Sequence, residues 1–86
     1  MKIAVFTIGA DEIRKRKMID LAQAWDFEGK YSDIKTLLDN ARKKKFDTVL
    51  VLDHYAIDDN AKKELANLKI EIIGLNDKKK LERRIL

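Results

Sequence analysis

Residues 46–52, FDTVLVL, are almost wholly apolar and rich in β-branched side chains. Such a stretch is typical of a strand buried on both faces of a sheet, because a half-exposed strand would alternate with polar residues. Similar stretches at 2–8, KIAVFTI, and 69–75, KIEIIGL, predict two more strands. Segments with apolar residues at helical spacing lie between them, so strands and helices should alternate along the chain.

The segments between the strands predict helices that begin at acidic caps. Asp11 is placed to cap a helix over 12–25, Ser32 or Asp33 a second helix, and Asp58 or Asp59 a third that runs to residue 68. The basic segment 76–86 predicts a last helix. The residues expected to face inward are Ile13, Met18, Leu21, Ala22 and Ala24, then Ile34, Leu37, Leu38 and Ala41, then Ala61, Leu65 and Leu68.

Residues 26–28 are consistent with a short edge strand, and Gly29 with a turn after it. Strands that alternate with helices imply parallel crossovers. We therefore predict one α/β domain over residues 1–86, a three-layer sandwich with a small, mostly parallel sheet of three or four strands flanked by helices. Ligands of such sheets bind at the carboxyl ends of the strands, here residues 7–11, 53–59 and 75–77.

The composition excludes several classes of function. Apolar residues make up 45% of the chain and charged residues 40%, which predicts a folded domain, and the absence of cysteine excludes disulfides and thiolate metal sites. No apolar run approaches the roughly 20 residues that span a bilayer, so we expect a cytoplasmic protein with no membrane partner. The net charge of +4 permits weak, non-specific contact with nucleic acid phosphates. The candidate contacts are Lys78, Lys79, Lys80, Arg83 and Arg84.

The strand ends hold few residues that could carry out catalysis. Thr7 with His54, the one histidine, is a weak candidate for a nucleophile and its base. Asp11 or Glu12 after the first strand, with Asp53, Asp58 or Asp59 after the second, suit magnesium. Asp11, Asp58 and Asp59 are also explained as helix caps, which leaves Asp53 alone. The segment TIGADE has one glycine where phosphate-binding loops need two or three. We therefore expect no metal and no cofactor.

Residues 29–51, GKYSDIKTLLDNARKKKFDTVLV, resemble the middle of the serine recombinase catalytic domain, the resolvase and invertase family. The common pattern is a glycine–basic turn, a helix with paired leucines, an alanine–basic segment and an FD-x-V-L-V strand. The segments MKIAVF at 1–6 and NLKIEIIGLND at 67–77 are similar to the family's first strand and to a later one. The resemblance implies a resolvase-like fold, and we expect no separate DNA-binding domain.

The chain departs from this family at the catalytic positions. The family's first strand ends in an arginine and, two residues later, the serine that attacks DNA; these positions hold Thr7 and Gly9. An aspartate–arginine pair and a second arginine hold the phosphate in the family. Here Tyr55, Ala56 and Asp59 occupy these positions, or, with a shift of two residues, Asp53, His54 and Ile57. Glycine has no oxygen for the attack, so strand transfer through a phosphoserine is excluded.

The resemblance therefore implies a catalytically inactive, resolvase-like domain, a pseudoenzyme that acts through protein–protein association. Its partner would be a second copy or a recombinase-type protein, and its context the DNA recombination of a mobile element. Leu81, Ile85 and Leu86 are the expected interface of a homodimer. Two alternatives stay open: a degenerate receiver-like signalling domain with Asp53 at the phosphoacceptor position, and a small magnesium-dependent hydrolase that uses Asp11 and Asp53.

Overall fold

A computed structural model describes residues 2–75, with the exception of the His54 side chain. Four strands form one sheet in which every neighbouring pair is parallel. The strands are β1 (Lys2–Phe6), β2 (Asp26–Tyr31), β3 (Thr48–Val51) and β4 (Glu71–Gly74), and their order across the sheet is β2-β1-β3-β4. The predicted sheet of three or four strands is confirmed, and it is parallel throughout.

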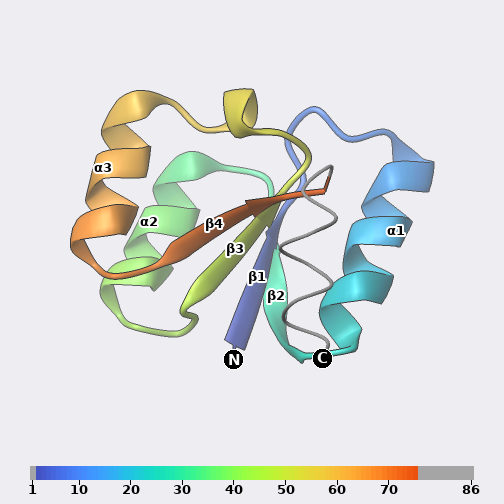
Figure 1. Ribbon diagram of the computed structural model, residues 1–86, viewed down its shortest axis with the longest axis horizontal. Coiled ribbons are helices and arrows are strands. Elements are labelled where there is room, and N and C mark those ends of the chain that lie inside the picture. The colour runs from blue at the N-terminus through green and yellow to red at the C-terminus, as the bar shows by residue number, and fades with distance from the viewer. Residues whose placement is uncertain (1, 76–86) are drawn as a thin grey trace.

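Helices cover both faces of this sheet and make the expected three layers. Helix α1 (Glu12–Gln23) lies on one face, and α2 (Ile34–Arg42) and α3 (Asp59–Asn67) lie together on the other (Figure 1). A short 3-10 helix, η1 (His54–Ala56), follows β3. Within residues 2–75, none of these helices has the length and apolar character needed to cross a membrane.

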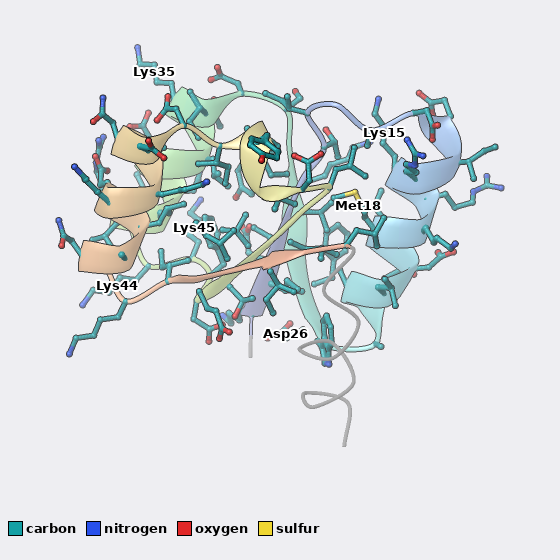
Figure 2. All side chains as sticks on the ribbon, turned by 45° about the horizontal axis from the view of Figure 1, so that its top comes forward. Lys15, Met18, Asp26, Lys35, Lys44 and Lys45 are labelled. Atoms are coloured by element: carbon teal, nitrogen blue, oxygen red, sulfur yellow. The ribbon has the colours of Figure 1, made fainter. Side chains whose placement is uncertain are left out.

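The core consists of two apolar clusters, one on each face of the sheet. On the face of α1, Ile3, Val5 and Leu50 of the central strands pack against helix residues that include Met18, which points toward the sheet (Figure 2). On the face of α2 and α3, strand residues such as Val49 pack against both helices. Every residue of β3 is buried, as the apolar stretch at 46–52 predicts. The two central strands therefore anchor both layers of helices.

The three α-helices begin at aspartates whose side chains accept backbone hydrogen bonds. Asp11 accepts from Arg14 N at 2.8 Å and Asp58 from Ala61 N at 2.7 Å. Asp33 accepts from both the N–H and the hydroxyl of Thr36, and these bonds lower the pKa of its carboxyl group. The predicted caps are confirmed, with Asp33 rather than Ser32 and Asp58 rather than Asp59 in the capping position.

Helices α2 and α3 end in the same kind of turn, with a lysine in the left-handed region of the backbone. Lys44 has a φ of 57° and Lys69 a φ of 62°. In each turn the lysine N–H bonds to a carbonyl three residues back and the next N–H to a carbonyl five residues back, as in Lys45 N to Asn40 O. This is the Schellman motif, which satisfies the last free carbonyls of a helix. Both turns lead the chain directly into the next strand.

Four sequence predictions were wrong in detail. Ala24 does not face inward but is exposed, and it follows the last residue of α1 as its C-cap. Gly29 lies inside β2 and is not a turn, because the edge strand continues to Tyr31. Thr7 follows β1 and is not part of it. Ile13 does not face inward but is 79% exposed. It lies five residues before Met18, which is about 140° around the helix from the side that faces the sheet.

Candidate functional site

The carboxyl ends of β1 and β3 form the candidate site, because the chain leaves these neighbouring strands toward opposite faces of the sheet. From β1 it passes to α1, and from β3 through η1 to α3, so that both loops lie at one edge of the sheet (Figure 1). In parallel α/β sheets this reversal of direction opens the crevice where ligands bind. The position agrees with the edge that the sequence predicts.

Thr7 is the first polar residue at this edge, and its hydrogen bonds have a structural role. Its side chain is 8% exposed, and its hydroxyl donates to the carbonyl of Tyr31 at 3.3 Å, beside a backbone bond of 2.9 Å from Thr7 N to the same oxygen. Thr7 thus ties the end of β1 to the end of the edge strand β2. The side chain of His54, the base that the sequence suggests for this hydroxyl, lies outside the described part of the structure.

Gly9 occupies the position at which the resemblance places a nucleophile. Its φ of +82° lies in the region that glycine adopts at no cost and other residues avoid. A Cβ added there would meet Leu52 Cδ2 at 3.7 Å, which is an ordinary contact. Backbone conformation rather than lack of space therefore favours glycine here, and a serine would be strained.

The acids of this edge begin helices. Asp53 accepts from Tyr55 N at 2.9 Å and so holds the start of η1, just as Asp11 and Asp58 hold α1 and α3. Asp59 lies in the first turn of α3, where a negative charge is favourable. Within residues 2–75, no group of three or more acids, histidines or cysteines is arranged to hold a metal ion. The candidate magnesium ligands Asp11 and Asp53 therefore act as caps.

Three of the remaining catalytic positions of the resemblance differ in their surroundings. Tyr55 is 98% exposed, whereas Ala56 is half-buried and packs against the core cluster of α2 and α3. In the shifted alignment Ile57 is buried in that same cluster. The predicted interface and phosphate-contact residues lie outside the described residues: Lys78, Lys79, Lys80, Leu81, Arg83, Arg84, Ile85 and Leu86.

Two features of the site escaped sequence reasoning. The large hydrophobic side chains that are most exposed among the described residues, Ile8, Ile13 and Tyr55, all follow β1 or β3. In addition, a groove of about 830 Å³ runs between α1 and the end of β2, and Ile13, Lys15, Arg16 and Lys30 are among the residues that line it. The spacing of the groove residues 12, 15, 16, 19 and 20 is that of one helix face, a signal that was present in the sequence.

Comparison with protein-family models, curated proteins and solved structures gave no match for this chain. The relationship to the serine recombinases therefore stays a prediction from the residues of the resemblance.

Proposed function

We propose that this chain is a binding domain without catalytic activity, which acts by associating with protein through the carboxyl edge of its sheet. One observation carries the proposal. The acids of that edge cap helices, while the most exposed large hydrophobic side chains of the described residues follow the same two strands. An edge with engaged acids and exposed apolar side chains suits a protein surface better than it suits catalysis.

Tyr55 is the strongest contact candidate. Its side chain is 98% exposed on the short helix η1, and tyrosine is among the residues that most often dominate binding energies. Ile8 and Ile13 add apolar surface on the loop and first helical turn after β1. Exposed apolar side chains lose their contact with water when a partner covers them, which favours association.

The partner that we propose is a second copy of the chain or a recombinase-type protein. The resemblance of residues 29–51 to the serine recombinases supports this choice, with the recombination of a mobile element as the context. Gly9 supports the catalytic part of the proposal, because its left-handed backbone and missing side chain do not suit a nucleophile. Incubation with DNA that carries recombination sites should therefore yield no covalent protein–DNA adduct in denaturing gels; an adduct would contradict the proposal.

Sedimentation velocity from micromolar to millimolar concentration tests the association. We expect a dimer for the wild type and a folded monomer for the double variant Ile8→Ser, Tyr55→Ser. The comparison variant Leu81→Asp, Ile85→Asp should remain dimeric. A wild type that stays monomeric throughout would contradict self-association, and a monomer only in the comparison variant would move the interface to residues 81–86.

A receiver-like signalling domain is the second candidate, because Asp53 is only half-buried at the carboxyl end of β3. Its carboxylate accepts a hydrogen bond from Tyr55 N, so phosphorylation would have to compete with the cap of η1. Treatment with acetyl phosphate and mass spectrometry would decide between the candidates. The added mass of one phosphoryl group on Asp53, absent in Asp53→Asn, would favour the receiver.

A further inference from the structure

The groove between α1 and the end of β2 is a second candidate site, which shares only Ile13 with the proposed association surface of Ile8, Ile13 and Tyr55. It is open to solvent and has a volume of about 830 Å³, within the range of about 300–1,000 Å³ that is usual for small-molecule sites. Thr7 and Ser32 line it at the carboxyl ends of the strands, the edge at which parallel sheets bind their ligands.

An irregularity of β2 directs Lys30 into this groove. Ile3 pairs with Phe27, but Ala4 pairs with Gly29, so Glu28 is an extra residue that forms a β-bulge. Phe27 belongs to the cluster on the α1 face, and strict alternation would point Lys30 to the opposite face. The bulge reverses this alternation. Lys30 pairs with Val5, whose side chain packs on the α1 face, and it lines the groove beside α1.

Tyr31 provides an independent check of this direction. It follows Lys30 and packs on the opposite face of the sheet, where its ring centroid lies 5.7 Å from that of Phe46. Its hydroxyl donates to Glu28 Oε2 at 2.6 Å. The side chain of Tyr31 therefore holds the bulge residue Glu28 in place. The face of the sheet to which Lys30 points thus depends on a defined local structure of the backbone.

Helix α1 contributes further positive charge. Lys15 and Arg16 line the groove, and Lys15 lies 3.4 Å from Glu12 Oε1. Arg16 and Lys30 form no ion pair with any other residue in the described range 2–75. Two cations that line one groove and have no ion-pair partner among residues 2–75 favour negative charge there, and arginine in particular suits the oxygens of phosphate.

The rest of the lining is mixed. Ile13 and Ile19 provide an apolar wall, while Glu12 and Asp20 provide acceptors for hydroxyl or amino groups. A phosphate monoester carries close to two negative charges at neutral pH, and it matches Lys30 and Arg16 better than a carboxylate with one charge does. We propose that the groove binds a phosphorylated small molecule of mononucleotide size, with its phosphate at Arg16 and Lys30 and its apolar body against the two isoleucines.

Titration with adenosine 5′-monophosphate, followed by amide NMR shifts, tests this site. We expect saturable shifts confined to residues around 12–20 and 30–32. Inorganic phosphate and adenosine, which each supply half of the ligand, should bind at least about tenfold more weakly. Lys30→Gln and Arg16→Gln should each weaken binding by about tenfold, because each removes one contact to the phosphate.

Lys17→Gln is the matched control, since Lys17 is an exposed cation of the same helix that does not line the groove. It should bind the nucleotide as the wild type does. Equal weakening in this control would mean attraction to net charge alone and would overturn the proposal. Absence of saturable shifts would also overturn it, as would a single-stranded oligonucleotide that binds through Lys30 and Arg16 where the mononucleotide does not. Repeating the titration in the Ile8→Ser, Tyr55→Ser variant, which leaves the groove residues unchanged, allows this proposal and the proposed function to fail separately.

Discussion

Strands β3 and β2 lie on either side of β1, yet they are built in different ways. All of β3 is buried, and its short apolar sequence has no irregularity. In β2 no residue is fully buried, and a bulge interrupts its pairing with β1. A central strand such as β3 can be recognised from the sequence, because burial on both faces requires an apolar stretch. An edge strand is determined by individual contacts, and in this molecule those contacts direct a candidate binding residue.

The largest expected difference between the two strands is in core packing. Leu50 of β3 is 0% exposed, so Leu50→Ala should lower the free energy of unfolding by about 2–5 kcal/mol. Phe27 of β2 is half-buried, and Phe27→Ala should cost less, about 1–2 kcal/mol. Urea denaturation monitored by circular dichroism measures both values. An equal or greater loss for Phe27→Ala would break the distinction between the central and the edge strand.

A smaller effect should come from the hydrogen bond that fixes the bulge. Tyr31→Phe removes the donor to Glu28 and should cost about 1 kcal/mol at neutral pH, measured by urea denaturation. Burial in the fold, together with the hydrogen bond and charge of Glu28, raises the pKa of Tyr31 above its ordinary value of 10.0. The exposed Tyr55→Phe serves as the control and should leave stability unchanged.

This raised pKa also predicts the direction of the pH dependence. The neutral phenol is favoured in the fold, so its contribution is fully present below pH 10.0 and is lost as the pH rises above that value. The stability difference between wild type and Tyr31→Phe should therefore shrink in alkali. A difference that grows with pH would mean that the Tyr31 hydroxyl is not held as the structure has it.

The smallest effects concern how the chain enters each strand. Before β3 it passes through Lys44 with a φ of 57°, so Lys44→Gly should stabilise the fold by about 1 kcal/mol. Before β2 it passes through Ala24, whose φ of −69° is right-handed, and Ala24→Gly should destabilise by about 0.5–1 kcal/mol. Thermal unfolding of the two variants checks the opposite signs. The same sign in both would contradict the described turns.

The same contrast explains how much of the fold could be predicted from the sequence. Apolar stretches identify β1, β3 and β4, and aspartates mark the helix starts, because burial and capping each depend on residue type. The course of β2 could not be predicted beyond Glu28. A glycine such as Gly29 is typical of a turn. The bulge also reverses the alternation of side chains between the two faces, so the sequence of β2 shows no regular period of two residues.

The candidate site was predictable in position but not in composition. Parallel connections place it at the carboxyl ends of β1 and β3. The engagement of Thr7 with the carbonyl of Tyr31 depends on a partner 24 residues away, which no local pattern reveals. The groove likewise needs Lys30 beside Lys15 and Arg16, and only the bulge brings them to one face.

The bulge at Glu28 has a further consequence for behaviour at high concentration. Within the described residues, β2 is an edge strand that pairs with β1 alone, so its outer backbone groups are available to a strand of another molecule. A flat strand in that position invites sheets to join edge to edge into aggregates. A bulge twists the edge away from such a partner, and the exposed Lys30 adds charge that must lose its water before another strand can dock. We therefore expect the bulge at Glu28 to limit edge-to-edge association through β2.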